Sequence, residues 1–453
     1  MKIIKIWLAC ITVLWICMYN LLAQEPLRMT VEQAEKHFLE KNLQLLAERY
    51  NIDIADAAIV QAKLPDNPTI SIGEVNFWHP NAVKELGLSS GAGAGTDLSA
   101  GSSVGSGSVA SAGSGTGSFG RNAAFSLELE QMIRTAGKRR KLIDLEKVSK
   151  EIAVQEFEAL LLGLKTELRV VLNETVYLQS YGHVIRTMKA SVESLVEVYK
   201  TQTIQGNVAK NELIRLQVSL IELESEANEV QTALNKQYKD LKVLLNLSAS
   251  ETNLFILPQE KAARHPDEIS LAALFEMAEK SRPEWLLSDR NREYSERLSA
   301  YEKSQRKPDV TFSIKYDRYG GVWRNFVGAG VRLDLPVFNR NQGAVRMAKA
   351  KIEQSQYQAE IQANAIRQEI TEIHSNYVMN FHFFEKLKAV DFPGDMEAMA
   401  TVYARNLLNK NINMLEYLDF MYACKSTRQA ILNAEKNLNT SFAELQCSIN
   451  NEL

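Results

Sequence analysis

Two stretches of the chain match catalytic motifs by spacing alone. Residues 115–120 (GTGSFG) have the glycine spacing of a dinucleotide-binding loop, and residues 101–105 (GSSVG) have that of a nucleophile elbow. Both chemistries require a strand before the motif and a helix after it. Both stretches lie instead in a glycine- and serine-rich tract, where such spacings arise by chance. No catalytic residue is predicted, and the chain is not expected to be an enzyme.

Metal ligation is the second chemistry to consider. His374 and His382 lie eight residues apart on one expected helix, and Met396 and Met399 lie at helical spacing. Thioethers suit Cu(I), but the ligands of a metal must converge, and ordinary packing explains these spacings equally well. We therefore predict no metal site and no cofactor.

A pair of carboxylates is the strongest candidate for a functional site. Glu416 and Asp419 are three residues apart, which places both side chains on one face of a helix. Carboxylates gathered around a narrow passage concentrate cations and repel anions. An ordinary solvated acidic pair is the alternative interpretation. The function of the Glu416–Asp419 pair depends on where its helix lies in the fold.

Composition and the first residues limit the class of protein. The chain has 453 residues, of which 45% are hydrophobic and 24% charged, and its formal charge of -3 argues against nucleic-acid binding. Lys2 and Lys5 precede a short apolar run that ends before Ala23, which predicts a signal peptide over residues 1–23. A retained membrane anchor is the alternative. Lipid attachment at Cys17 would need a small residue before it, where the chain has Ile16.

An internal repeat organises the rest of the chain. "SLELEQMIRTAGK" (126–138) aligns with "RLDLPVFNRNQGA" (332–344) at an offset of 206, and "YKTQTIQGNVAKNELIRLQ" (199–217) aligns with "YARNLLNKNINMLEYLDFM" (403–421) at an offset of 204. We therefore expect two repeats, 24–246 and 270–453, joined by a linker over 247–269. Half of the 22 glycines fall between residues 86 and 120, which predicts a flexible loop inserted in the first repeat.

Each repeat is expected to contain an opening helix, a β-hairpin and two long helices joined at a tip. In the first repeat these are the helix 30–63, the hairpin 68–133 with its loop 79–121, the helices 135–204 and 209–246, and the tip 204–213. In the second they are the helix 270–305, the hairpin 309–336, the helices 340–407 and 412–449, and the tip 408–419.

The returning helices have the apolar seam of a coiled coil. Apolar residues recur at alternating steps of three and four: Leu213, Leu216, Leu220, Leu223, Ala227, Val230 and Leu234. The corresponding positions of the second repeat are Tyr417, Phe420, Cys424, Thr427, Ile431, Ala434 and Leu438. Cys424 is therefore expected to pack in the seam, and with Cys447 it lacks the spacing of a metal site.

The strands alternate between one apolar and one polar face, as in a membrane barrel with a water-filled lumen. Aromatic residues near the strand ends would fit an interfacial girdle: Phe77, Trp78, Trp323, Phe326 and Phe338. Four strands cannot close a barrel, and an open edge cannot face lipid, so several chains would have to pool their strands. Three chains would supply about 12 strands, which is within the range of known barrels.

The chain resembles the TolC family of outer-membrane efflux proteins. The resemblance lies in the segments "LELEQMIRTAGKRR", "LDLPVFNRNQG", the two tips and "SRPEW" (281–285). The segments "DNPTISI" and "GKRR" are similar to the heavy-metal branch of the family, which includes CusC and CzcC. It implies a homotrimer with a 12-stranded outer-membrane β-barrel continued by a periplasmic α-helical barrel. It also implies a passive exit duct that an adaptor protein couples to an inner-membrane pump of the RND or ABC type.

The resemblance implies roles for particular residues. Glu416 and Asp419 occupy the positions of an acidic aperture ring, with Glu212 as their equivalent in the first repeat. Adaptor docking would use the tips: Gly206, Asn207, Val208, Leu213, Asn411, Ile412 and Leu415. Gly137, Pro336 and Gly343 would mark the change from barrel to tunnel. Lys410 replaces the usual glycine, so Asn411 is expected to adopt the left-handed conformation, and Ile412 replaces an arginine that latches the closed tip in some members.

Two alternatives to this function stay open. The duct could serve a type I protein-secretion system rather than a metal or drug exporter, because the sequence does not identify the cargo. A periplasmic coiled-coil scaffold without a pore would also explain the seams and the signal peptide. It would not explain why strands with alternating faces occur at the same place in both repeats.

Overall fold

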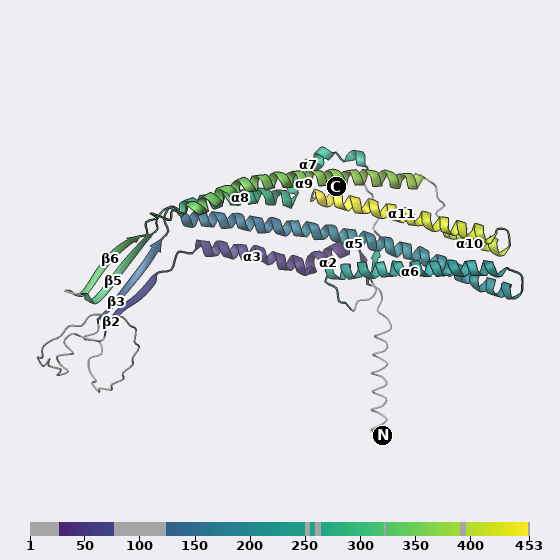
Figure 1. Ribbon diagram of the computed structural model, residues 1–453, viewed down its shortest axis with the longest axis horizontal. Coiled ribbons are helices and arrows are strands. Elements are labelled where there is room, and N and C mark those ends of the chain that lie inside the picture. Colours follow the sequence, from purple (N-terminus) through teal and green to yellow (C-terminus); the bar gives the residue numbers. More distant parts are fainter. Residues whose placement is uncertain are drawn as a thin grey trace, which may run out of the picture. The chain divides into compact units, whose positions relative to one another are not determined.

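The computed structural model describes residues 27–76, 124–249, 254–258, 264–320, 323–389 and 396–451 (Figure 1). The predicted signal peptide, the glycine-rich loop, Phe77 and Trp78 lie outside these ranges. The chain divides into two compact units. Of the described residues, one unit contains those within 27–57, 147–295 and 351–451, and the other contains those within 58–76, 124–146 and 296–350.

Helices and strands follow the same order in the two halves of the chain. The first half contains β1 (Leu27–Thr30), α2 (Val31–Lys41), α3 (Leu43–Lys63), β2 (Thr69–Asn76), β3 (Ala124–Ile133), α5 (Lys138–Ile204) and α6 (Lys210–Leu244). The second half contains β4 (Leu254–Leu257), the 3-10 turn η1 (Pro266–Glu268), α7 (Leu271–Ser281), α8 (Pro283–Ser304), β5 (Val310–Gly320), β6 (Trp323–Leu333), α9 (Gln342–Ala389), α10 (Met396–Leu408) and α11 (Met414–Ser448).

The longest helix, α5, has 67 residues and is therefore about 100 Å long at 1.5 Å per residue. Its counterpart, expected over 340–407, is described as α9 and α10, and residues 390–395 between them lie outside the described ranges. No helix within the described ranges combines the length and apolarity needed to cross a membrane.

Each expected opening helix is in fact two helices. The first is interrupted at Asn42, whose side-chain oxygen accepts a hydrogen bond from the Leu45 amide at 3.0 Å and so caps α3. The second is interrupted at Arg282, which is extended at ψ 120° because Pro283 follows it. Pro283 then begins α8, where its missing N–H is not needed.

The linker predicted over 247–269 contains a strand that the sequence did not reveal. Strand β4 pairs in parallel with β1, with Leu27 opposite Leu254 and Thr30 opposite Leu257. A four-residue strand carries too short a pattern to be recognised in the sequence. The pairing connects the beginning of the described chain to the segment between its halves.

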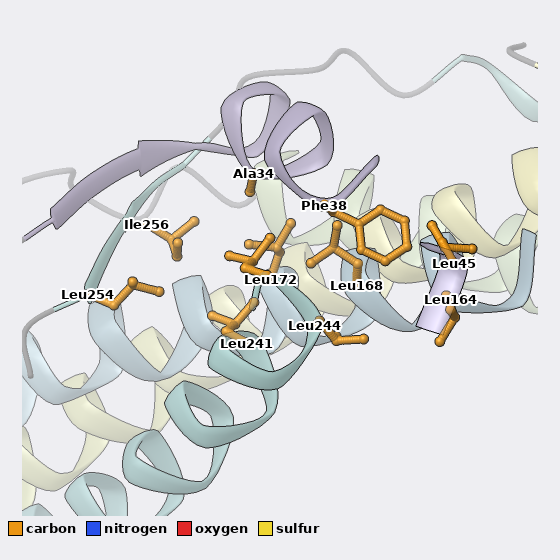
Figure 2. Packing of buried hydrophobic residues seen from close by; sticks show 11 residues of the cluster. Ala34, Phe38, Leu45, Leu164, Leu168, Leu172, Leu241, Leu244, Leu254 and Ile256 are labelled. Atoms are coloured by element: carbon orange, nitrogen blue, oxygen red, sulfur yellow. The ribbon is translucent and has the colours of Figure 1, made fainter. Parts of the chain in front are cut away.

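A buried apolar cluster holds these pieces together in the larger unit. Figure 2 shows Phe38 of α2 next to Leu168 of α5, with Leu244 of α6 below them and Ile256 of β4 beyond Leu172. Phe38 and Leu168 are completely buried. The cluster consists of Ala34, Phe38, Leu45, Leu164, Leu168, Leu172, Leu241, Leu244, Leu245, Leu254 and Ile256.

Four of the seven predicted seam residues on each returning helix are buried, and the other three are partly buried. On α6, Leu216, Leu223, Val230 and Leu234 are at most 8% exposed, whereas Ile221 on another face is 66% exposed. On α11, Tyr417, Cys424, Ala434 and Leu438 are buried. Burial also raises the pKa of the Cys424 thiol, which keeps it protonated and agrees with a packing role.

The second unit contains a four-stranded antiparallel sheet in the order β2-β3-β5-β6. Its register places apolar side chains in rows across all four strands, such as Ile70, Leu129, Ile314 and Ala329. The alternate rows are polar, for example Ser71, Glu128, Lys315 and Gly328. The two faces therefore differ as the sequence predicted.

The apolar face of this sheet is exposed in the single chain. Ile72 is 69% exposed, Ile314 56% and Val331 61%. The outer strands β2 and β6 each have one neighbour within the described sheet. The sheet therefore has both an apolar face and two edges that need partners.

Two of the aromatic residues expected in a girdle can be located by their side chains. Phe338 is 93% exposed in the segment after β6. Phe326 pairs with Asp317, which places it on the polar face, and its ring packs near the Cα of Gly328. Phe326 therefore does not fit an outward-facing girdle. Trp323 begins β6, and its side chain lies outside the described part of the structure.

Replacing Asn42 with Ala should destabilise the larger unit by about 2 kcal/mol. Asn42 is 4% exposed, and its Nδ2 atom also donates to the Leu244 carbonyl at 2.8 Å. The variant would remove both hydrogen bonds and leave a buried carbonyl without its donor. Chemical denaturation measures the effect. Asn51→Ala is the control, because Asn51 is exposed and, within the described ranges, its side chain bonds to Glu48 of the same helix. Equal losses in the two variants would contradict the assignment.

Candidate functional site

The two tips lie side by side at one end of the larger unit (Figure 1). A single apolar cluster packs the end of α5 and the start of α6 against α10 and the start of α11. Its buried members are Val192, Leu195, Val196, Tyr199, Leu216, Leu223, Leu407, Met414, Tyr417, Leu418 and Met421. The candidate site is therefore one packed structure built from both halves of the chain.

Helix α5 ends in a glycine-based cap. Gly206 has φ 76°, its amide donates to the Thr203 carbonyl at 3.1 Å, and the Asn207 amide donates to the Gln202 carbonyl at 2.9 Å. These two bonds form a Schellman motif, which satisfies carbonyls that the last helical turn leaves free. Glycine fits because it adopts positive φ without strain.

Helix α10 ends in the same motif but with a lysine in the left-handed position. Lys410 has φ 59°, its amide donates to the Leu407 carbonyl at 3.0 Å, and the Asn411 amide donates to the Asn406 carbonyl at 2.9 Å. The expectation that Asn411 takes the left-handed conformation is therefore wrong. The hydrogen bonds of the motif determine which position is left-handed. The preference of asparagine for the left-handed region does not shift that position to Asn411.

The returning helices start differently. At α11, the Asn413 side chain accepts from the Glu416 amide at 2.9 Å, and the Glu416 carboxylate accepts from the Asn413 amide at 3.0 Å. This is a capping box. At α6 the corresponding residue is Ala209, which provides no side-chain cap. The second tip is thus better held at the start of its returning helix than the first.

The predicted gate residues occupy matching positions on the two helices. Glu416 and Glu212 are each the third residue of a returning helix. Glu416 and Asp419 are both exposed, one turn apart on α11. Glu212 is half-buried, and its charge adds to the effect of burial in raising the pKa of Tyr199. Glu416 also has a structural role, because its carboxylate is part of the capping box of α11.

The predicted docking residues divide into two groups. Gly206, Asn207, Asn411 and Leu415 are exposed, and the apolar Leu415 is 63% exposed. Val208, Leu213 and Ile412 pack partly against the apolar cluster of the tips. The second group therefore supports the shape of the tips, and the first group forms their accessible surface.

Polar contacts that the sequence did not reveal join the first coiled coil to the second. Lys425 of α11 and Glu226 of α6 form an ion pair at 2.6 Å, and the Tyr181 hydroxyl of α5 donates to the same carboxylate. Burial, together with this carboxylate, raises the pKa of Tyr181. The Tyr422 hydroxyl of α11 donates to Glu222 of α6 at 2.5 Å. Their positions beside the seam are the only sequence indication of these contacts.

The two candidate histidine ligands make other contacts. His374 lies 3.3 Å from the Ile269 carbonyl, and His382 makes an edge contact with Phe381. The Met396 side chain lies outside the described residues. Among the residues that the structure describes, no group of three histidine, cysteine or acidic side chains could hold a metal ion.

The strand-to-helix junction of the first half is built on Asp309. Its carboxylate accepts from the Thr135 amide at 2.9 Å and pairs with Lys138 at 2.7 Å. Lys138 is 4% exposed. Between them, Ala136 and Gly137 have φ 55° and 66°. Gly137 therefore lies at the bend as predicted.

The junction of the second half uses a different residue. Asn341 has φ 55°, and its Nδ2 atom donates to the Glu302 carboxylate at 2.6 Å. Gly343 lies in the first turn of α9 without positive φ, so the bend expected there occurs at Asn341. After Pro336, the Val337 amide donates to the Leu335 carbonyl at 2.9 Å and tightens the turn.

Comparisons with solved structures place this architecture among outer-membrane channel proteins. The CmeC outer membrane channel of Campylobacter jejuni gives a TM-score of 0.69 at 12% identity, over 92% of this chain and 85% of that one. The outer membrane protein VceC of Vibrio cholerae gives 0.66 at 15% identity, over 93% and 96%. CusC, described as forming a transmembrane channel, gives 0.65 at 12% identity, over 93% and 92%.

These similarities establish the fold of the single chain, which agrees with the mainly helical fold and short strands expected from the sequence resemblance. The TM-score with CusC is not higher than the other two, so the comparisons do not favour the heavy-metal branch. No protein-family model matches the chain. No curated protein matches it either.

Replacing Lys410 with Gly should stabilise the end of α10. A residue with a Cβ atom in the left-handed region costs about 1 kcal/mol relative to glycine, so amide protection at residues 406–411 should rise about fivefold in hydrogen exchange. Lys410→Ala keeps the strain and removes the charge, so it should leave protection nearly unchanged. Equal gains in the two variants would show that charge, and not backbone strain, limits this turn.

Proposed function

We propose that this protein is the outer-membrane exit duct of a tripartite export system, a member of the TolC family that transports passively and catalyses no reaction. The observation that carries the proposal is the sheet. It has one apolar and one polar face, two open edges and a continuation into very long helices. A lipid-facing exterior and a water-filled lumen require this arrangement.

The duct requires a homotrimer. In lipid, each unpaired backbone N–H or C=O group at β2 and β6 would cost several kcal/mol. Three copies would join β6 of one chain to β2 of the next and close a barrel of about 12 strands. The long helices would form a periplasmic α-helical barrel below it. The protein would therefore reside in the outer membrane with its helices in the periplasm.

An internal duplication accounts for the two halves of the chain. Left-handed residues end the four long helical segments at Gly206, Asn246, Lys410 and Asn450. The first and third are 204 residues apart, as are the second and fourth. Equal spacing of these caps supports two copies of one unit, with the glycine-rich insertion in the first hairpin.

The tips are the proposed contact for partners. Asn207, Asn411 and Leu415 offer an exposed surface to a periplasmic adaptor protein, which would connect the duct to an inner-membrane pump of the RND or ABC type. Such a pump would choose the cargo, whether metal ion, drug or secreted protein.

The gate of the duct would consist of Glu416 and Asp419, with Glu212 beside them. Three copies of the pair would bring six carboxylates around the axis and favour cations. The Glu226–Lys425 contact lies between the two coiled coils of one chain, where it would help to hold the tips together in the absence of a latching arginine at Ile412. A periplasmic scaffold would leave the apolar face of the sheet without a partner.

Membrane fractionation tests the proposed function directly. The full-length protein should be released from outer membranes by detergent and not by salt, and it should migrate as a trimer. It should also conduct ions in planar bilayers, because the closed barrel would enclose a polar lumen. A salt-soluble monomer without conductance would support the scaffold and contradict the duct.

Neutralising the gate should reduce its preference for cations. Glu416→Gln with Asp419→Asn removes both charges, and glutamine at 416 can still complete the capping box. We expect the cation-to-anion permeability ratio in planar bilayers to fall roughly twofold to tenfold, measured near 0.1 M salt, where screening extends over about 10 Å.

The control for this experiment is Asn413→Ala. It removes the cap of α11, at a cost of about 1 kcal/mol, and leaves both charges in place. Its permeability ratio should therefore match that of the unmodified protein. An unchanged ratio in the neutralised variant would exclude these carboxylates as the gate.

A further inference from the structure

One row of the sheet carries a cation on the apolar face. Because Ser126 pairs with Asp317 and Asp317 with Phe326, the adjacent row contains Phe125 of β3, Arg318 of β5 and Asn325 of β6. This row is two residues along each strand from the row formed by Leu127, Tyr316 and Val327, so it lies on the same face of the sheet. Arg318 therefore belongs to the face that the proposed duct turns toward lipid.

The described side chains around Arg318 do not include an acidic partner. Its guanidinium carbon lies 5.8 Å from the centre of the Phe125 ring, and that ring lies 5.8 Å from the ring of Tyr316. The Tyr316 hydroxyl donates to Asn325 Oδ1 at 2.8 Å, so the amide nitrogen Nδ2 of Asn325 is the remaining donor of that side chain. Within the described ranges, Arg318 forms no ion pair.

On the polar face, by contrast, Arg332 and Lys315 have acidic neighbours. Arg332 donates two hydrogen bonds to Glu130, at 3.0 and 3.1 Å. Lys315 pairs in register with Glu128 on the neighbouring strand. An arginine that faces hydrocarbon and has no carboxylate partner among the described side chains can be satisfied by a negative group of the surrounding lipid.

The height of Arg318 on the sheet indicates that partner. The apolar rows begin at Val310, next to the junctions with α5 and α9, and Arg318 is eight residues further along the strand. At about 3.3 Å per residue and a tilt of about 40°, this is roughly 20 Å, close to the height of about 25 Å of a barrel's apolar band. Arg318 thus lies at the outer boundary of the band, where lipid headgroups begin.

We propose that Arg318, assisted by Asn325, binds the phosphate of an anionic lipid in the outer leaflet. The planar guanidinium can donate two parallel hydrogen bonds to phosphate oxygens. The Phe125 ring fixes its position by a cation–π contact. This inference rests on the proposed function, because it requires that the apolar face meets lipid.

Binding of lipid A, a phosphorylated lipid, by the detergent-purified full-length protein tests the proposal. Arg318→Gln should weaken lipid A binding about fivefold per site, the effect of one arginine at an anionic surface, whereas Arg318→Lys should retain part of the affinity. Lys315→Gln is the matched control, because it removes a charge from the polar face of the same strand, and it should bind as the unmodified protein does. Lipid A without its phosphates should bind the unmodified protein and Arg318→Gln alike.

The outcomes separate this inference from the proposed function. Bilayer conductance is measured on every variant, and Arg318→Gln should conduct normally because its change lies outside the lumen. If the unmodified protein conducts but Arg318→Gln binds lipid A equally well, or if millimolar inorganic phosphate displaces the lipid, the lipid site is wrong and the duct stands. If the unmodified protein does not conduct, both the duct and the lipid site fail.

Discussion

Unsatisfied backbone groups at the edges of one small sheet constrain the whole molecule. Strands β2 and β6 each have a single neighbour in the described sheet, and the apolar face between them is exposed. In water this combination favours aggregation, and in lipid it is prohibitive unless the edges find partners. In the proposed duct, closure by identical copies would resolve both problems, and the long helices of each copy would then run in parallel from a common ring.

The periodic parts of the structure were predictable from sequence. The seam around Leu216 and the alternating face around Ile314 depend on spacing alone, and burial and register follow it. The interruptions were less predictable. Asn42 ends one helix and caps the next because of a contact with Leu244, 202 residues away, and no local pattern contains that information.

The errors at the candidate site have one cause. Asn411 was expected to be left-handed and Gly343 to mark a junction because of their residue types, whereas Lys410 and Asn341 have the positive φ. Hydrogen-bond geometry at a helix end selects a position first, and the residue at that position then tolerates the conformation or is strained by it. The two tips therefore differ: the first has a relaxed turn and an uncapped returning helix, and the second has a strained turn and a firmly capped one. Forces applied at the tips would meet different weak points in the two coiled coils.

The pairing of β1 with β4 has a consequence for biogenesis. Leu27 and Leu254 are adjacent in the parallel ladder, yet ribosomes make one more than 200 residues before the other. Such a contact has a very high sequence separation, which slows its formation. The earliest described strand cannot pair with β4 until nearly half of the polypeptide has been synthesised after it, and an intermediate with such an unpaired edge is prone to aggregation, so it would benefit from chaperone protection.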